Sequence, residues 1–332
     1  MDAMRKLIER YVPIINEELD KATRGKPEQL YNAARHLLLA GGKRVRPSLT
    51  LTYARMLGGV DGERKALPFA VSVELLHNFT LVHDDIMDKD EYRRGVKTVH
   101  TVYGENMAII AGDLLFALSF ENALNNSMVP PENRSAAAYL LSKASRIVAE
   151  GQALDVSFED TWTVSIDDYL DMIYRKTGAL IEASTGMGAL AVTLDKETVE
   201  NAMLYGRNVG ISFQLKDDVL GVYGDPAKTG KPVYNDLARA KKTILVLYAV
   251  RNLPPDESAE LKRIIDMKTS NLELLKTAAD LIEKSGAKKY ALDLAKKYSD
   301  EAIRIIEEIE PADSEAKNAL IEFARFVFER EK

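Results

Sequence analysis

The chain has 332 residues, of which 46% are hydrophobic and 29% are charged, and its net charge is −6. This apolar content supports a large buried core and excludes a mainly disordered chain, while the negative charge argues against nucleic acid as the main partner. The sequence contains no cysteine, which excludes disulfides, thiolate metal sites and a cysteine nucleophile. Binding of anions must therefore come from local clusters of lysine and arginine.

The pattern of the whole chain indicates helices. The first twenty residues are charged and amphipathic, without the apolar core of a signal peptide. No segment approaches about 18 uninterrupted apolar residues, so we expect no membrane span and a cytoplasmic protein. Strand-like alternation is nearly absent, and no linker or shift of composition marks a boundary. We predict one all-α domain over residues 1–332.

The first cluster of cations is Gly41-Gly42-Lys43-Arg44-Val45-Arg46-Pro47, with three basic residues beside a glycine turn and a proline. A lone cation is usually an ordinary solvated side chain, so this cluster gains meaning only from the motifs that follow. Arginine offers a planar fork that matches phosphate oxygens, which makes such a cluster a candidate for binding a phosphorylated ligand.

The first acidic segment follows the apolar run Val73–Val82 and places Asp84 and Asp88 one turn apart on one helix face. Such a pattern alone is more often a solvated helix end, but this preceding run is too continuous for an exposed helix. Two close carboxylates repel each other, and Mg²⁺ relieves the repulsion while keeping positions for water and phosphate oxygens. Arg93 and Arg94 stand just beyond. We therefore predict a site for magnesium and a diphosphate.

The middle of the chain continues in helices. Pro131 suits the first turn of one helix, and Ser165-x-x-Asp168 matches the capping box that starts another. Lys176 and Thr177 lie inside the following helical run. These two residues indicate a ligand-binding role only when they are considered together with the acidic segments.

A second acidic segment ends another apolar helix, where Gln214 precedes Asp217 and Asp218. The position one turn after Asp217 is Gly221, so this segment lacks a third carboxylate and is weak evidence by itself. More basic residues follow it, at Lys231, Lys241 and Lys242.

These motifs together resemble the trans-isoprenyl diphosphate synthases, the chain-elongating prenyltransferases. Gly-Gly-Lys-Arg-x-Arg-Pro, Asp-Asp-x-x-Asp with Arg-Arg-Gly, Lys-Thr-Gly and Phe-Gln-x-x-Asp-Asp occur in the family's order, from about Tyr31 to Thr243. Lesser marks are Gly112-Asp113 and Gly151-Gln152-x-x-Asp155. The resemblance implies a single-domain bundle of long, mostly antiparallel helices around a deep central cavity, assembled as a homodimer or higher homo-oligomer.

The reaction implied by the resemblance joins an allylic diphosphate to isopentenyl diphosphate with release of pyrophosphate, and Mg²⁺ is the implied cofactor. Metal ions and cations stabilise the leaving diphosphate, and fixed dipoles in a dry cavity stabilise the allylic cation without trapping it. No side-chain nucleophile is needed. By the same resemblance, the implied magnesium ligands are Asp84, Asp88, Asp217 and Asp218. The residues that would contact isopentenyl diphosphate are Lys43, Arg46, His77 and Arg94. Those that would contact the allylic diphosphate are Arg93, Lys176, Thr177, Gln214, Lys231 and Lys241, and the catalytic ones among them would be Lys176, Thr177, Gln214 and Lys231.

Some assignments stay open between neighbouring residues. Arg44 and Lys242 are adjacent cations that can stand in for Arg46 and Lys241. His83 fits a packing role better than a metal-ligand role, and Asp155 fits either a contact with metal-bound water or a structural role in its helix.

The product length is predicted from the residues that precede Asp84, because the growing chain should extend beneath the metal site. Phe79 and Thr80 lie roughly 6–8 Å deeper along the helix, and Leu76 is the next candidate. A single aromatic residue five positions before the aspartate resembles the archaeal type that forms geranylgeranyl diphosphate. We expect mainly that C20 product, from dimethylallyl, geranyl or farnesyl diphosphate as the primer.

The alternatives come from different classes of protein. A farnesyl diphosphate synthase or a bifunctional C15/C20 enzyme is the nearest alternative, but farnesyl-forming members of the family usually carry further bulky residues nearby or an insertion within the acidic segment, and neither is present here. A non-catalytic subunit of a heteromeric prenyltransferase usually loses the aspartates or the arginine pair, and both are present here. A class I terpene cyclase needs no site for isopentenyl diphosphate, which the two basic motifs oppose.

Overall fold

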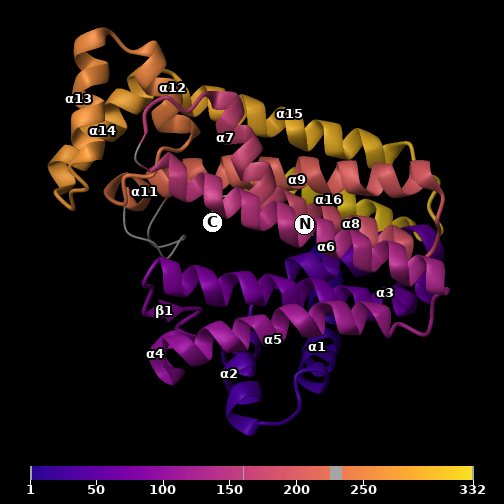
Figure 1. Cartoon of the computed structure of the whole chain (residues 1–332). Helices are drawn as coiled ribbons and strands as arrows, with labels where there is room; N and C mark the ends of the chain where they lie inside the picture. Colours follow the sequence, from indigo (N-terminus) through magenta and orange to yellow (C-terminus); the bar gives the residue numbers. More distant parts are fainter. Residues whose placement is uncertain (1, 160, 225–233, 331–332) are drawn as a thin grey trace. The chain divides into compact units, whose positions relative to one another are not determined.

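The computed structural model describes residues 2–159, 161–224 and 234–330, and helices dominate all of these segments (Figure 1). The only strands among the described residues are the short pair β1 (Tyr92–Arg93) and β2 (Val96–Lys97). The all-α prediction is therefore confirmed.

The described chain divides into two compact units, each assembled from separate stretches of sequence. The first comprises Met1–Arg146, Leu180–Gly206 and Ile306–Glu322, and the second comprises Ile147–Ala179, Arg207–Ile305 and Phe323–Lys332. Single-domain organisation of residues 1–332 stays a prediction.

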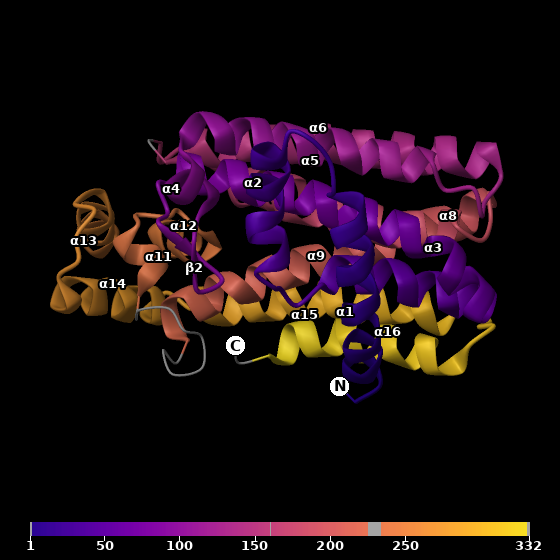
Figure 2. The ribbon, with the colours of Figure 1, turned by 90° about the horizontal axis from the view of Figure 1, so that it is seen from below.

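The first unit is built around α3 (Val45–Met87), which packs along α5 (Glu105–Leu124); Figure 2 shows both helices from a second direction. Within the predicted apolar run Val73–Val82 of α3, residues 73–76, 78 and 82 are buried and the others are half-buried, so this run is not an exposed helix. At Gly59 the φ angle is 60° and the helix is interrupted. The other helices that lie wholly in this unit are α1 (Asp2–Ala22), α2 (Glu28–Leu39) and α4 (Val99–Tyr103).

Helix α5 is the one described helix whose length and composition would allow it to cross a bilayer, and about a third of its apolar window is buried, 33%. The core helices of soluble proteins meet the same criterion, and α5 packs along α3.

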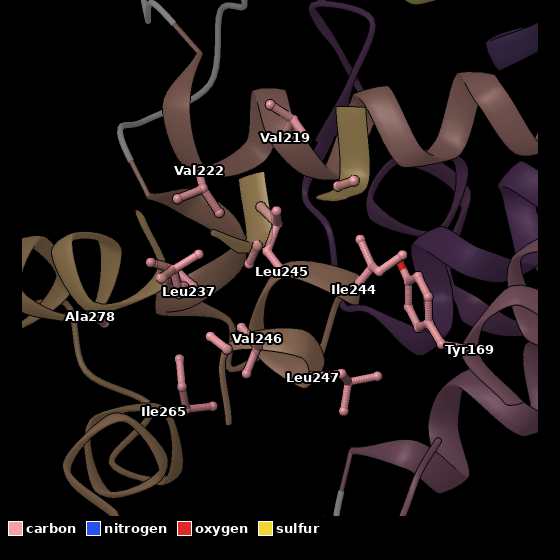
Figure 3. Packing of buried hydrophobic residues seen from close by; sticks show 14 of the residues in the cluster. Tyr169, Val219, Val222, Leu237, Ile244, Leu245, Val246, Leu247, Ile265 and Ala278 are labelled. Carbon is pink, nitrogen blue, oxygen red and sulfur yellow. The ribbon is translucent and has the colours of Figure 1, made fainter. Parts of the chain in front are cut away.

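The second unit has its own core. Buried side chains from α7 (Ile166–Ile173), α12 (Ile244–Asn252) and the second part of α9 (Lys196–Tyr223) meet in one cluster (Figure 3). The predicted capping box is confirmed, because the Ser165 side chain accepts from the Asp168 backbone and Asp168 accepts from the Ser165 backbone. Other elements with residues in this unit are the π-helix η1 (Tyr174–Gly178), α11 (Asn235–Ala238), α13 (Pro255–Asp266), α14 (Leu272–Lys284) and α15 (Ala287–Glu307).

Three further helices contain residues of both units or join them in sequence: α6 (Pro131–Phe158), α8 (Ala179–Leu190) and α16 (Ser314–Glu329). Helix α6 begins at Pro131, as predicted from the preference of proline for the first helical turn.

Candidate functional site

The first acidic segment lies at the C-terminal end of α3, in the first unit. The Asp88 backbone N–H donates to the Asp84 carbonyl over 2.8 Å, so the helical turn that puts the two side chains on one face is present. Asp84 is half-buried and Asp88 is exposed. Two carboxylates one turn apart at the end of a helix fit the oxygen ligands that magnesium prefers.

The middle aspartate of this segment, Asp85, has a different role that sequence reasoning missed. It is buried and forms an ion pair with the Nε of Arg93. Burial raises the pKa of the Asp85 carboxyl, and the Arg93 charge opposes that rise. The ion pair ties the β1–β2 hairpin to α3, so Asp85 positions the arginine pair.

The hairpin turn explains the Arg-Arg-Gly motif. Arg94 and Gly95 occupy its two central positions with φ angles of 54° and 78°, as a type I′ turn requires. Only the second of these is a glycine, so Arg94 is held in a conformation that a side chain rarely adopts. The hairpin thereby holds the Arg94 side chain against α2 and α3, whose Leu37 carbonyl and Asn78 amide oxygen lie 3.4 Å from its Nη1.

The glycine pair of the first basic motif lies against Arg94. The Nη1 of Arg94 donates to the Gly41 carbonyl over 2.6 Å. A Cβ atom on Gly42 would lie 3.0 Å from the Arg94 Cζ, and Gly42 has a φ of 142°, which side chains rarely adopt. Glycine at this position is therefore required by the approach of the guanidinium.

Arg46 and His77 meet beside these residues. The Nη1 of Arg46 lies 3.2 Å from the His77 Nε2, and the Arg46 Nε is buried without a hydrogen-bond partner among the described residues. Burial lowers the pKa of His77 far below its usual value, and the charges of Arg46 and Arg94 add to this effect, so His77 is neutral. Crowded guanidinium groups with an unsatisfied donor are arranged to receive an anion.

Arg44 does not share this site, although the sequence leaves it as a substitute for Arg46. Its side chain is fully buried and donates to the Glu74 carboxylate over 2.6 Å. The Asn78 amide donates to the same carboxylate oxygen over 3.2 Å. Glu74 and Asn78, two polar residues four apart in an apolar run, are the sequence signal for this network. Lys43 is exposed.

The Lys-Thr-Gly motif forms most of η1 in the second unit, and π-helical turns frequently occur at functional sites. A Cβ atom on Gly151 would lie 2.3 Å from the Lys176 backbone nitrogen, so the glycine of the Gly-Gln-x-x-Asp motif admits the η1 backbone. The Lys176 Nζ and the Asp155 carboxylate form an ion pair of 2.5 Å. Asp155 therefore positions the lysine.

Thr177 and Gln214 are brought together as the motif match implies. The Thr177 hydroxyl donates to the Gln214 Oε1 over 3.2 Å, and the Gln214 Nε2 donates to the Asp218 Oδ1 over 3.1 Å. The other Asp218 oxygen accepts from the Tyr169 hydroxyl over 2.5 Å. Nothing in the sequence around Tyr169 signals this role.

Burial raises the pKa of Asp218 to about 8, because desolvation outweighs the hydrogen bonds from Tyr169 and Gln214. Both of its oxygens accept hydrogen bonds from protein side chains. The Asp217 side chain is 35% exposed. Asp217 is thus the more exposed carboxylate of this segment.

The missing third carboxylate of this segment also has a structural account. A Cβ atom on Gly221 would lie 1.9 Å from the Asp236 Oδ2, so Asp236 of α11 occupies the space beside α9 that a side chain at 221 would need. Its charge adds to the rise in the pKa of Asp218. Asp236, which precedes the Lys241-Lys242 pair, is a residue that sequence reasoning missed.

We expect Gly221→Ala to destabilise the protein by about 1–3 kcal/mol, because the added methyl group must displace the buried Asp236 side chain. Thermal unfolding measures the loss. Gly286→Ala is a contrasting control with open space around its Cβ and a φ of 80°, so backbone strain alone would act there. A Gly221→Ala protein as stable as wild type would contradict the close packing.

The remaining cations differ in their surroundings. Lys241 is exposed, and its backbone N–H donates to the Asp236 carbonyl over 3.0 Å. Lys242 instead donates to the Glu159 carbonyl and lies over the Trp162 ring, so it does not replace Lys241. Lys231 lies outside the described residues.

The candidate chain-length residues lie on α3 below Asp84. The Phe79 ring centroid is 4.7 Å from that of His83 and 5.1 Å from that of Phe116 on α5. His83 is a packing residue, as expected: a Cβ on Gly112 would lie 2.3 Å from its Nε2, so that glycine makes room for the ring. Leu76 is buried, and the Thr80 hydroxyl donates to the His77 carbonyl over 2.8 Å.

Among residues 2–159, 161–224 and 234–330, no group of three or more acidic or histidine side chains is placed to hold a metal ion by itself. Magnesium at either acidic segment would therefore complete its coordination with water and phosphate oxygens, as this ion usually does.

Residues 27–282 match the family model described as polyprenyl synthetase. The chain is 46% identical over 308 residues to a geranylfarnesyl diphosphate synthase from Aeropyrum pernix, covering 92% of this chain and 96% of the relative. It is 41% identical over 320 residues to a geranylgeranyl diphosphate synthase from Saccharolobus solfataricus, covering 96% and 95% of the two chains.

Two solved structures are also similar to this chain over nearly its whole length. A geranylgeranyl pyrophosphate synthetase from Pyrococcus horikoshii is similar with a TM-score of 0.91 and 40% identity, over 99% of this chain and 98% of that one. A polyprenyl synthase from Caulobacter crescentus, solved with calcium and isoprenyl diphosphate, has a TM-score of 0.87 and 32% identity, over 100% and 98%.

Proposed function

This chain belongs to the polyprenyl synthetase family and is a trans-prenyltransferase, and from that premise we propose that it makes mainly geranylgeranyl diphosphate. It would condense dimethylallyl, geranyl or farnesyl diphosphate with isopentenyl diphosphate and release pyrophosphate. The observation that carries the proposal is the anion-receiving cluster of Arg46, His77 and Arg94 on the same unit as Asp84 and Asp88. A cluster of this kind is needed for isopentenyl diphosphate and not for a cyclase.

We assign one magnesium position to Asp84 and Asp88 in the first unit and a further one to Asp217 in the second unit, because carboxylates suit this ion. The calcium in the Caulobacter structure supports a divalent cation. When bound, magnesium supplies Lewis-acid stabilisation of the leaving diphosphate. We propose that Asp218 positions neighbouring side chains and does not contact the metal, because its two oxygens accept hydrogen bonds from Tyr169 and Gln214.

The remaining residues bind and orient. Lys43, Arg46 and Arg94 would hold isopentenyl diphosphate, with neutral His77 as a further hydrogen-bond partner. Arg93, Lys176, Lys231 and Lys241 would hold the allylic diphosphate. Because Thr177 donates to Gln214 and Gln214 donates to Asp218, the oxygen dipoles of Thr177 and Gln214 are fixed before any charge develops on the allylic carbon. Neither side chain is a strong nucleophile, so the cation would survive long enough to be attacked by the double bond of isopentenyl diphosphate.

Incubation with dimethylallyl diphosphate, labelled isopentenyl diphosphate and magnesium tests the proposal. Chromatography of the dephosphorylated products should show a main C20 alcohol and some C15. Absence of any labelled product would indicate a non-catalytic subunit, and hydrocarbon formed from geranyl or farnesyl diphosphate without isopentenyl diphosphate would indicate a cyclase. A C25 main product would match the activity named for the Aeropyrum relative instead.

The proposal includes a cytoplasmic homodimer without a membrane span. Helix α5 exposes Ile109, Ile110, Phe116 and Leu124 within one face, on which Asp113 also lies. A second copy of the chain is the occupant that the family implies. Light scattering of the purified protein should give twice the mass of the 37.0 kDa chain.

Phe79→Ala should shift the products to longer chains while turnover persists, because the ring that packs on His83 and Phe116 would no longer limit the cavity beneath Asp84. Product chromatography measures the shift. Tyr139→Ala, which removes an aromatic ring that is 73% exposed in the same unit, should leave the product length unchanged. An active Phe79→Ala enzyme that still stops at the wild-type length would direct attention to Leu76 and Thr80.

A further inference from the structure

The C-terminal Arg330 reaches the second acidic segment. Its Nη2 donates to the Phe213 carbonyl over 3.1 Å and lies 3.3 Å from the Asp217 Oδ1. The guanidinium carbon stands 4.0 Å from the centre of the Phe213 ring. All three residues belong to the second unit. The side chain that pairs with the proposed metal ligand is thus supplied by the last described residue of the chain.

This contact is built into the fold. The Arg330 side chain is 7% exposed, and its Nε is buried without a hydrogen-bond partner among the described residues. Its backbone N–H continues α16 by donating to the Phe326 carbonyl over 2.8 Å. The preceding turn is anchored, because the Ser299 hydroxyl donates to the Ala324 carbonyl over 2.8 Å and Phe328 packs against the core cluster of this unit.

The positive charge of the Arg330 guanidinium lies beside the negative charge of the Asp217 carboxylate. Removing the guanidinium from water is unfavourable and lowers the pKa of Arg330, and the carboxylate of Asp217 opposes that effect. The adjacent Asp218 cannot serve as the partner, because its oxygens accept from Tyr169 and Gln214. Arg330 therefore contributes a positive charge and a hydrogen bond to Asp217 when no metal is bound.

We propose that Arg330 is the counter-ion of Asp217 in the metal-free protein, and that Arg330 and magnesium compete for this carboxylate. The inference rests on the proposed function, in which Asp217 is a metal ligand. A fixed positive charge beside a metal ligand repels the incoming cation and occupies one of the oxygens it needs. Arg330 thus positions Asp217 before metal binding and lowers the affinity of the second acidic segment for metal.

Binding of Mn²⁺ alone, followed through the electron paramagnetic resonance signal of the free ion, tests the competition without an activity assay. Arg330→Gln should bind Mn²⁺ at least about threefold more tightly than wild type, since it removes the competing charge. Arg330→Lys keeps the charge and should stay within about twofold of wild type. Arg330→Met, which retains an apolar stem over Phe213, replaces the glutamine variant if that one does not fold.

A second readout is the melting temperature in EDTA. Arg330→Gln should melt below wild type, because Asp217 loses its ion pair with Arg330, and saturating Mn²⁺ should narrow the difference in melting temperature. Arg263→Gln is the matched control, since it removes an exposed arginine, paired with Glu260, from the same unit. It should leave both the Mn²⁺ affinity and the melting temperature near those of wild type.

The Asp217 variant tests the metal assignment, and the Arg330 variants test the competition. Asp217→Asn should bind Mn²⁺ more weakly than wild type, and equal binding would remove Asp217 from the proposed metal site. If Asp217→Asn is weaker but the neutral Arg330 variants bind Mn²⁺ as wild type does or more weakly, competition is wrong and the metal assignment stands.

Discussion

Replacing Asp84 or Asp88 by alanine should lower turnover about a thousandfold or more, equivalent to ~4 kcal/mol of transition-state stabilisation. The reason is that both carboxylates would hold magnesium on the leaving diphosphate. Steady-state release of pyrophosphate from geranyl diphosphate and isopentenyl diphosphate measures the loss. Asp88 is exposed and Asp84 is half-buried, so the melting temperature should change little.

Two other aspartates of α3 provide contrasting controls. Asp61→Ala removes an exposed carboxylate that pairs with Arg64 and Lys65, and it should retain wild-type turnover. Asp85→Asn should differ from the Asp84 and Asp88 variants and from the Asp61 variant. It weakens the buried ion pair with Arg93, so it should lower the melting temperature as well as the turnover rate. Near wild-type turnover in the Asp84 or Asp88 variant would contradict the magnesium assignment.

Arg94→Ala should raise the KM for isopentenyl diphosphate about a hundredfold, because a guanidinium bound to a diphosphate contributes about 1.5–3 kcal/mol through charge-assisted hydrogen bonds. The KM for the allylic substrate should change far less. Lys231→Ala should show the reverse bias or a lower kcat, since its motif belongs to the allylic diphosphate. Measuring initial rates against each substrate in turn separates the two effects.

The structure refines what the arginine variant tests. Arg94 also donates to the Gly41 carbonyl, so its loss can loosen the glycine turn as well as remove a charge. Arg5→Ala, which removes an exposed cation paired with Glu9 in the same unit, controls for the net charge. Equal changes in both KM values for Arg94→Ala and Lys231→Ala would mean that the division between the two diphosphates is wrong.

The sequence alone was sufficient for the helical class and for the prenyltransferase family, while the individual site residues remain predictions. The helical class follows from local periodicity. The burial of Val73, which precedes the first acidic segment, could be predicted because exposing a continuous apolar run to water is unfavourable. The chemistry follows from residue type, since paired aspartates and clustered arginines suit few ligands other than a metal-bound diphosphate.

Only the tertiary structure distinguishes the surroundings of side chains that the sequence leaves equivalent. Arg44 and Arg46 are both arginines in one motif, but only packing shows that Arg44 pairs with buried Glu74 while Arg46 keeps an unsatisfied nitrogen. Likewise Asp218 is buried while the Asp217 side chain is 35% exposed, although the two residues are neighbours in sequence. Asp236 beside Gly221, and Arg330 on Asp217, come from segments distant in sequence. Such pairings depend on how helices pack in space, and local patterns carry no information about them.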